Sequence, residues 1–447
     1  MIDFALSPSQ HALRAAAASF AQSHLSTVPS LHPPPSQSTQ LTRFRSTRPV
    51  YSAAVRTGLL KAQIPAALGG TAHSLLDAAL VVEELYAVEP SAALTLLGTG
   101  LGLTPLVLAG SEEQRARFLA PFLDDSLGGE PLASFVHSEP RGTANWLEKG
   151  ARGLGTTARR EGDDWWIVDG EKLWTTNSGG WDGRGAQLQC VVCRYVRDSS
   201  SSSNEGPQGP DRDPADDVLV LLVTPDVVAA NPPDAYQVLD EPELAGFRST
   251  SGPHSRFTGL RVPHANLLCP PGMGAQVVEQ TFGTSAALVG AMGVGIMRAA
   301  FDAAIKFAKD DSRGGNVPIL ERQSVADLLM DVKMRTETSR LLTWKALHAL
   351  EKGPGDWKAR LELALQAKIY SSEAAVQSVI DAMKAVGITS YATDQPFSKL
   401  LNEAMVLPLF DGGNVGVRRR QIQKIFLDAG YEPWVATYGQ AERGQND

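Results

Sequence analysis

One acidic residue of this chain stands in surroundings that suit a catalytic base. Asp411 follows the apolar run VLPLF and precedes two glycines and an asparagine. Burial beside such residues would raise the pKa of a carboxyl group towards that of a useful base, and the glycines would let a planar ligand approach the backbone. The alternative is that Asp411 caps the helix that begins in NVGVRRRQIQ, a role that aspartate often fills. The local pattern alone leaves both interpretations open.

Three consecutive arginines follow this aspartate. Arg418 lies seven residues after Asp411, about two helical turns. An intact helix would return it to the same face, where its charge would keep the base ionised. The ordinary interpretation of Arg418, Arg419 and Arg420 is a solvated helix face with one inward member. Nucleic acid is not expected as a partner, because the net charge of the chain is −8 and such a chain repels a polyanion.

Cysteines and glycines at suggestive spacings have simpler explanations. Cys190 and Cys193 form a CxxC pair in an alternating apolar run, but an odd separation in a strand points the side chains to opposite sheet faces. No second pair lies nearby, so no metal site is expected. Gly290, Gly293 and Gly295 lie inside a helical pattern rather than after a strand, which favours close helix packing over a phosphate loop.

Two histidines and three tryptophans are the remaining candidates. His137, in FVHSEP at the end of an expected strand, could be a general base, and His264, in VPHANL, could equally be a satisfied loop histidine. Trp165 and Trp166 are expected to pack on a sheet, whereas packing explains Trp174, at a strand end, less easily.

Three regions of different periodicity would have to position these residues. The first third repeats apolar residues at helical spacing, and Ser111 to Gln114 fits a capping box. Between about Pro131 and Leu268 short β-rich runs such as LQCVVCRYV and VLVLLVT favour an antiparallel sheet. From Gln276 onward long helical patterns return and predict an antiparallel bundle. The chain is therefore expected to be an α+β protein.

Loop composition marks the connections. The segment RDSSSSSNEGPQGPDRDPADD separates two expected strands and is predicted to be a mobile surface loop rather than a domain boundary. The stretches NPPDAYQ and HPPPSQSTQ are expected to be shorter loops of the same kind.

Composition and termini bear on the cellular environment. The chain has only three cysteines, too few for a disulfide framework, and this usage suits a reducing compartment. Its start, MIDFALSPSQ, is unlike a signal peptide, and its end, GQND, is not a peroxisomal signal. No apolar segment is expected to approach the roughly 20 residues that span a bilayer. A cytoplasmic location without membrane contact is the expectation.

Six strings of this chain together resemble the acyl-CoA dehydrogenase superfamily. They are HSEPRGTANWLEKG, GEKLWTTNSGGWD, DSRGG, ERQSVADLL, IDAMKAVG and PLFDGGNVGVRRRQ, and the likeness covers nearly the whole chain. It implies an N-terminal helical domain over residues 1–130, a middle antiparallel β domain over 131–270 and a C-terminal four-helix bundle over 271–447. Homotetramers with FAD between domains and subunits are also implied. The periodicity gives the same order of regions independently.

The resemblance also assigns residues to FAD. The flavin and its pyrophosphate are expected to be held by Val136, His137, Ser138, Thr143, Ala144 and Asn145, and the isoalloxazine ring to lie against Trp174, Thr175 and Thr176. The cofactor of a neighbouring subunit is expected to be reached by Arg313 and Gln323. The flavin around the base is expected to be flanked by Phe410, Gly412 and Gly413.

Within the superfamily the chain is most similar to the branch that oxidises nitroalkanes. Acyl-CoA dehydrogenases usually carry Glu-Gly-Thr where this chain has Asp411 and two glycines, and a glutamine that contacts FAD where it has Lys384. Both departures match that branch, in which a serine and an arginine contact the catalytic aspartate. Ser285 and Arg418 occupy the matching positions. The ordinary explanation of Ser285 is helix packing, since a mid-helix serine is common.

The reaction that the resemblance implies starts when Asp411 removes the proton from the carbon that bears the nitro group. The carbanion would attack flavin N5, nitrite would leave, and water would open the adduct to an aldehyde or ketone. Oxygen would then reoxidise FAD and give hydrogen peroxide. Two alternatives stay open: an acyl-CoA dehydrogenase-type desaturase that uses electron-transfer flavoprotein, and a DNA-binding flavoprotein of the alkylation-response type.

Overall fold

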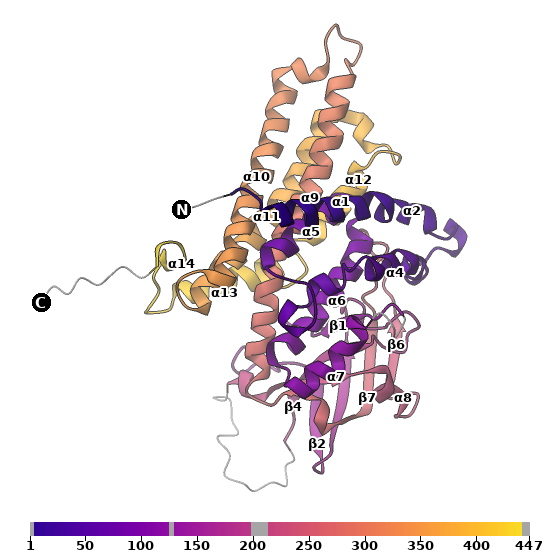
Figure 1. Ribbon diagram of the computed structural model, residues 1–447, viewed down its shortest axis with the longest axis vertical. Coiled ribbons are helices and arrows are strands. Elements are labelled where there is room, and N and C mark those ends of the chain that lie inside the picture. The colour runs from indigo at the N-terminus through magenta and orange to yellow at the C-terminus, as the bar shows by residue number, and fades with distance from the viewer. Residues whose placement is uncertain (1–3, 125–128, 198–212, 440–447) are drawn as a thin grey trace, which may run out of the picture.

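The computed structural model describes residues 4–124, 129–197 and 213–439 of the chain. Helices precede an eight-stranded sheet, and long helices follow it (Figure 1). The predicted α+β fold is therefore confirmed, while domain boundaries near residues 130 and 270 stay predictions. Most of the Ser-rich segment predicted to be a surface loop, residues 198–212, lies outside the described residues.

Serine caps begin several helices of the N-terminal region. Ser111 and Gln114 form the capping box that the sequence predicts. Ser7 forms a capping box before the helix that begins at Pro8, and Ser74 caps the helix that begins at Leu75 through its hydroxyl alone. The helices of this region are α1 (Pro8–Ser23), α2 (Val28–Leu31), α3 (Gln40–Ser46), α4 (Arg48–Arg56), α5 (Leu75–Tyr86), α6 (Pro90–Ala109) and α7 (Glu112–Leu123).

Two helices are longer and more apolar than the sequence analysis expected. By length and composition alone, α6 and α9 (Gly274–Asp310) could each cross a membrane, so the expectation of no apolar segment near 20 residues was wrong. The core helix of a globular protein passes the same test, and 56% and 61% of the two apolar windows are buried inside the protein. Both helices belong to the large hydrophobic core, and an all-round apolar helix is what such a position requires.

The sheet is mixed, which corrects the expectation of a wholly antiparallel one. Its strands follow the order β6-β7-β3-β2-β4-β5-β8, and β1 pairs with β4. The pairs of β4 with β1 and with β2 are parallel, whereas the other pairs are antiparallel. The strands are β1 (Ala133–Val136), β2 (Thr157–Glu161), β3 (Trp165–Lys172), β4 (Leu188–Tyr195), β5 (Val218–Val223), β6 (Tyr236–Asp240), β7 (His254–Pro263) and β8 (Leu267–Cys269).

The end of β1 is shaped by the way two strands pair with β4. β1 lies opposite residues 188–191 of β4, and β2 begins opposite Arg194. Beyond β1, the Glu139 carboxylate accepts N–H groups from Gly155 and Thr156 at 2.6 and 2.9 Å and pairs with the buried Lys172 at 3.0 Å. The Glu139 side chain thus supplies hydrogen bonds at the point where β1 ends and β2 replaces it as the parallel partner of β4, and it fixes the segment that contains His137.

Alternate residues of β4 enter different cores. Cys190 belongs to the large core shared with the helices, and Cys193 belongs to a second core on the other face, to which Val227 of α8 (Pro225–Ala229) also contributes. The prediction that the two cysteines point to opposite faces is confirmed. Both are free and buried, which raises the pKa of the Cys193 thiol to about 12. The expected loop NPPDAYQ instead contains the start of β6 at Tyr236.

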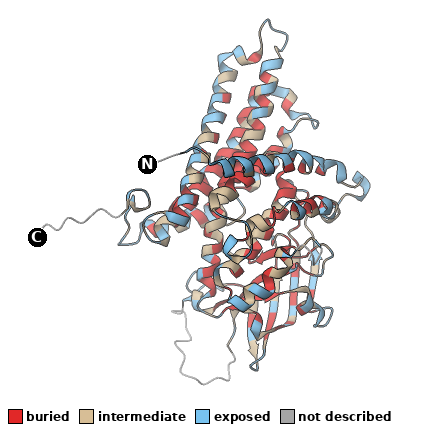
Figure 2. Ribbon diagram, viewed as in Figure 1, coloured by how far each residue is buried: buried red, intermediate tan, exposed pale blue. Residues whose placement is uncertain are grey.

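Long helices pack closely in the C-terminal region. Side chains added at Gly290, Gly293 and Gly295 of α9 would lie 2.2, 2.9 and 2.7 Å from atoms of α10, α11 and α5, so close packing is the confirmed role of these glycines. Buried residues gather where these helices meet each other and the sheet, whereas the outer face of α1 is exposed (Figure 2). The remaining helices are α10 (Gln323–Lys352), α11 (Trp357–Val386), α12 (Phe397–Val406), the π-helix Asn414–Arg418, α13 (Arg419–Phe426) and α14 (Val435–Tyr438).

Candidate functional site

Asp411 lies in the loop that joins α12 to the π-helix. Its side chain is 7% exposed. The Ser285 hydroxyl of α9 donates to Asp411 Oδ1 at 2.5 Å, and Arg418 Nη2 lies 3.1 Å from Asp411 Oδ2. The three residues expected to act together in catalysis therefore meet, although Ser285 and Asp411 are 126 residues apart in sequence.

The helix-cap interpretation of Asp411 is not supported by this geometry. The residue that precedes the π-helix is Gly413, and no side chain makes a capping hydrogen bond there. Both carboxylate oxygens of Asp411 are engaged by Ser285 and Arg418 instead. The side chain is therefore held across the interior rather than against the helix that follows it.

The backbone of the Asp411 loop is left-handed at two successive residues. Asp411 has φ 51° and Gly412 has φ 73°. A Cβ at residue 412 would lie 2.8 Å from Arg418 Nε, so this position requires glycine. The left-handed conformation costs an aspartate about 1–2 kcal/mol. Arg418 offsets this cost by donating from Nε, at 2.8 Å, and from Nη2 to the Asp411 carbonyl oxygen.

Opposing effects act on the pKa of Asp411. Burial is the largest effect and raises the pKa of the carboxyl group above its ordinary value. The Arg418 charge, the Ser285 hydrogen bond and the charge of Lys368 lower it, without cancelling the effect of burial. A raised pKa makes the carboxylate a stronger proton acceptor.

The arginine triplet has one inward member, as the sequence predicts. Arg418 is buried, with its guanidinium 5.6 Å from the centre of the Phe282 ring. Arg419 pairs with Glu373 at 2.9 Å, and Arg420 donates to the Asn145 side chain. Because the two outward arginines have partners within the protein, the triplet does not form a free basic surface.

Candidates at the end of β1 approach the Asp411 loop through aromatic side chains. The His137 ring lies 5.4 Å from the Phe282 ring, edge to face, and the Phe282 carbonyl accepts from Arg418 at 3.4 Å. Lys172 Nζ donates to the His137 carbonyl at 2.8 Å, and the Leu173 N–H donates to the Ser138 carbonyl at 3.0 Å. Val136 is the last, fully buried residue of β1. These contacts fix the three residues beside the candidate base.

His137 itself is a poor general base. Burial lowers its pKa to about 3, so the ring is neutral at physiological pH. Its Nε2 atom is buried and has no hydrogen-bond partner among the described residues. A buried ring nitrogen without a partner suits contact with a bound group better than proton abstraction.

The turn that contains Thr143, Ala144 and Asn145 lies beside the π-helix. A Cβ at Gly416 would be 3.8 Å from the Ala144 side chain, and Arg420 donates to Asn145. The structure thus places this turn next to the segment that follows Asp411. Phe410, just before the aspartate, packs its ring 6.1 Å from that of Phe247.

Trp174 has an unusual backbone and an exposed ring. Its φ is 64°, the residue is 53% exposed, and the neighbouring Thr175 donates from its hydroxyl to Ser178 at 2.8 Å. A Cβ at Gly98 of α6 would lie 2.7 Å from the Thr176 side chain, so α6 packs closely against this turn. A bulky aromatic residue in the left-handed region is rare, and such outliers cluster at functional sites.

Arg313 and Gln323 are not brought to this site. Arg313 follows the far end of α9, where it donates to the Val386 carbonyl at 2.6 Å, and Gln323 begins α10. Between Ser285 and the end of α9 at Asp310 the helix rises by roughly 38 Å. Within one chain these two residues cannot join the group around Asp411, and a role towards a neighbouring subunit stays a prediction.

Sequence reasoning missed a buried lysine beside the Asp411 loop. Lys368 of α11 donates from Nζ to the Gly412 carbonyl at 3.1 Å and to Asn414 Oδ1 at 2.7 Å. The pattern of α11 could have revealed it, because Lys368 falls on the apolar stripe with Leu361 and Leu365. A charged residue on such a stripe needs a buried partner.

The other sequence candidates have structural roles. Trp166 is buried and donates from Nε1 to His264 Nδ1 at 3.0 Å, so His264 is a loop histidine with a partner. The Arg261 guanidinium lies over the Trp165 ring, 4.6 Å from the centre of that ring. No cluster of three or more His, Cys, Asp and Glu side chains that could hold a metal occurs within residues 4–124, 129–197 and 213–439.

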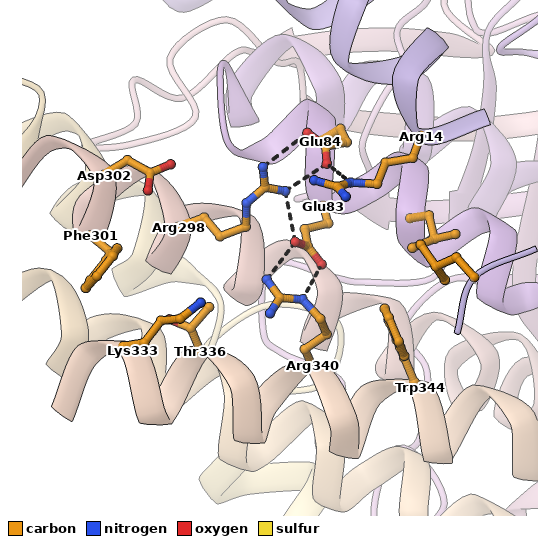
Figure 3. A pocket seen from close by; sticks show the side chains of 12 residues that line it. Arg14, Glu83, Glu84, Arg298, Phe301, Asp302, Lys333, Thr336, Arg340 and Trp344 are labelled. Atoms are coloured by element: carbon orange, nitrogen blue, oxygen red, sulfur yellow. Dashed lines mark hydrogen bonds and ion pairs between the residues drawn. The ribbon is translucent and has the colours of Figure 1, made fainter. Parts of the chain in front are cut away.

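A separate cavity of about 370 Å³ lies between α1, α5, α9 and α10 (Figure 3). Five of its charged groups pair with one another: Glu84 with Arg14 and Arg298, and Glu83 with Arg298 and Arg340. None of the residues around Asp411 lines it. The cavity is therefore bordered by an ion-pair network that joins four helices, and not by the candidate catalytic groups.

The residues near Asp411 suit a flavin. The unpartnered His137 ring nitrogen offers a polar contact, and the end of β1 and the 143–145 turn both border the Asp411 segment. This site, on a helical, β, helical fold, defines the acyl-CoA dehydrogenase class. Residues 7–126 match the acyl-CoA dehydrogenase N-terminal domain, and residues 272–427 match its C-terminal domain.

Relatives that match nearly the whole chain define its family within this class. The chain is 55% identical to nitroalkane oxidase of Fusarium oxysporum, covering 99% of both chains, and 54% identical to that of Podospora anserina, covering 98% and 99%. A solved nitroalkane oxidase structure superposes with a TM-score of 0.93 and 55% identity, over 98% of this chain and 100% of that one. The chain belongs to the nitroalkane oxidase family of the acyl-CoA dehydrogenase superfamily, whose members are flavin-dependent oxidoreductases.

Proposed function

We propose that this chain is an FAD-dependent oxidase that converts nitroalkanes to aldehydes or ketones with release of nitrite and hydrogen peroxide. The observation that carries the proposal is the buried Asp411 carboxylate, held by Ser285 at 2.5 Å and Arg418 at 3.1 Å. FAD, when bound, supplies the electron acceptor at the substrate carbon and passes the electron pair to oxygen. The protein's own task is to remove a proton at a fixed place.

Solved structures of relatives support these roles. One contains an active-site mutant with aspartate replaced by asparagine, crystallised with 1-nitrooctane, and another an active-site mutant with serine replaced by alanine, crystallised with 1-nitrohexane. A third concerns the roles of an arginine and the same aspartate in the reaction of the flavoprotein nitroalkane oxidase. In those proteins the arginine follows the aspartate by 7 positions and the serine precedes it by 126, the separations found here between Asp411, Arg418 and Ser285.

The arrangement explains how Asp411 can act as the base. Ser285 and Arg418 each donate one hydrogen bond to a different carboxylate oxygen, which leaves acceptor capacity on both oxygens for a substrate proton. They also fix the orientation of the carboxylate, and fixed placement supplies much of the rate of such a step. A proton beside a nitro group is far more acidic than one beside a thioester, so a carboxylate whose basicity is raised by burial is a sufficient base.

FAD would be held by Val136, His137, Ser138, Thr143, Ala144 and Asn145, with Trp174, Thr175, Thr176, Phe410, Gly412 and Gly413 beside the ring. We also propose a homotetramer in which Arg313 and Gln323 contact the cofactor of a neighbouring subunit. The distance between the Arg313 end of α9 and Ser285 supports this arrangement, since roughly 38 Å of helix separates them.

The experiment that tests the function is a nitrite assay on the purified protein. Nitrite release and oxygen consumption would be measured with nitroethane, 1-nitrohexane and 2-nitropropane, beside butyryl-CoA with an artificial electron acceptor. We expect a yellow protein that releases nitrite from nitroalkanes and does not oxidise the thioester. Oxidation of butyryl-CoA without nitrite release, or a colourless protein that FAD does not reconstitute, would overturn the proposal.

A further inference from the structure

The loop that contains Asp411 is held from a second side by α11. Lys368, with a fully buried side chain, donates to the Gly412 carbonyl at 3.1 Å and to Asn414 Oδ1 at 2.7 Å. Asn414 in turn donates to the Ser372 hydroxyl at 3.0 Å and to Glu373 at 3.1 Å. Three residues of one helix therefore fix the backbone immediately after the candidate base.

Two cations hold two successive carbonyl groups of the left-handed turn. Arg418 binds the carbonyl oxygen of Asp411, and Lys368 binds that of Gly412. The φ angles of 51° and 73° at these residues direct both carbonyls and, with them, the Asp411 side chain. Without Lys368, the Gly412 carbonyl would lose this donor, and one of the two restraints on an intrinsically unfavourable backbone would disappear.

We propose that Lys368 is a positioning residue for proton abstraction: it fixes the Asp411–Gly412 backbone in its left-handed conformation and places a second cation beside the carboxylate. Lys368 does not touch the substrate carbon in this role; it acts through Asp411. The inference rests on the proposed function, because it assigns Lys368 to the step in which Asp411 accepts the proton.

The charges around Lys368 agree with this role. Asp411 and Arg418 face it from the loop and the π-helix, Glu373 faces it from its own helix, and Glu279 of α9 acts on Arg418. Burial lowers the pKa of Lys368 to about 7, and Asp411 opposes that change. By reciprocity, a cation at residue 368 lowers the pKa of Asp411. Its removal should therefore move the acidic limb of the pH profile to higher pH.

The test compares Lys368→Met with a matched control on the same helix. Methionine fills a similar volume without a donor or a charge. Lys358→Met makes the same change where the side chain is exposed and bound to Asp428. Each holoenzyme would be assayed for kcat and KM with neutral nitroethane and with its pre-formed nitronate anion, across pH, beside flavin absorbance and circular dichroism.

We expect Lys368→Met to lower kcat/KM for neutral nitroethane by about 10- to 100-fold, the loss that follows a misplaced catalytic group. Most of the loss should appear in kcat, and the acidic limb should move to higher pH. Oxidation of the nitronate, which needs no proton abstraction, should stay near the wild-type rate. The Lys358→Met control should match wild type in all respects.

Other outcomes overturn the inference. If Lys368→Met oxidises neutral nitroethane at the wild-type rate, Lys368 does not position the base. If neutral and anionic substrates lose activity equally, its role is structural only. Should the methionine variant fail to fold, Lys368→Gln, which keeps an amide donor but has no charge, replaces it. The acidic limb should still move to higher pH, and an unmoved limb or a failure to fold would overturn the inference. If wild type releases no nitrite, the proposed function itself is wrong.

Discussion

Replacing Asp411 with asparagine separates proton acceptance from the other roles of this side chain. Asparagine is nearly isosteric and, like aspartate, tolerates the φ of 51° found here. Its amide oxygen can accept from Arg418, while its NH₂ group donates to the Ser285 hydroxyl. That hydroxyl can then donate to the Phe282 carbonyl, which is 3.2 Å away. Each polar group of the pocket therefore keeps a partner in the variant.

The structure sets different magnitudes for stability and for catalysis. Removal of one partner from a buried ion pair costs about 3–5 kcal/mol. Arg418 retains the Asp411 carbonyl, the Phe282 carbonyl and Gln421 as acceptors, so we expect the lower end of that range. Loss of a general base lowers the rate by about 10²–10⁴-fold, and a factor of 10² corresponds to about 2.7 kcal/mol in activation free energy.

The assay follows nitrite release from neutral nitroethane and oxygen consumption with its nitronate. In Asp411→Asn we expect kcat/KM for the neutral substrate to fall by at least about 10²-fold, with flavin absorbance retained. The nitronate should be oxidised much better, relative to wild type, than the neutral substrate. Asp428→Asn, an exposed aspartate paired with Lys358, is the control and should behave as wild type. Turnover of neutral nitroethane at the wild-type rate would show that Asp411 is not the base.

Three further substitutions test separate parts of the structure. Ser285→Ala removes a hydrogen bond that lowers the pKa of Asp411, so the acidic limb of kcat/KM for nitroethane should move to higher pH and the plateau should fall about 10-fold; an unchanged pH profile would contradict this. Arg313→Ala should weaken FAD binding if the residue serves a neighbouring subunit, as measured by flavin released on gel filtration, and full flavin retention in a monomer would refute the assembly. Burial raises the pKa of Glu403 from 4.5 to about 7, so its contribution to stability is complete below pH 4.5 and is lost as the pH rises through about 7. Relative to Glu403→Gln, wild type should lose up to about 3 kcal/mol of stability between pH 5 and 8, measured as the difference in denaturant midpoints, and parallel curves would show that Glu403 titrates normally.

Local sequence patterns were sufficient for much of the fold. Capping residues such as Ser111 and the periodicity of α9, α10 and α11 were predictable, because caps and helical periodicity act within a few residues of the chain. The same reasoning missed the parallel pairing of β1 and β2 with β4, which joins segments that no local signal connects.

The residues of the candidate site, like the fold, were predictable from the sequence only in part. Residue spacing alone pointed to Asp411, its glycines and Arg418, and the family resemblance pointed to Ser285, but the sequence left the cap and the base as alternatives. Only the tertiary structure separates them, because the orientation of the Asp411 carboxylate depends on α9, from which Ser285 donates across 126 residues of chain. Lys368 shows the same dependence, since a lysine on an apolar stripe has no evident role until packing brings the Gly412 carbonyl to its Nζ atom. Local interactions set the helices, caps and turns, whereas the ionisation of a buried group is set by the charges and hydrogen bonds that distant helices place around it.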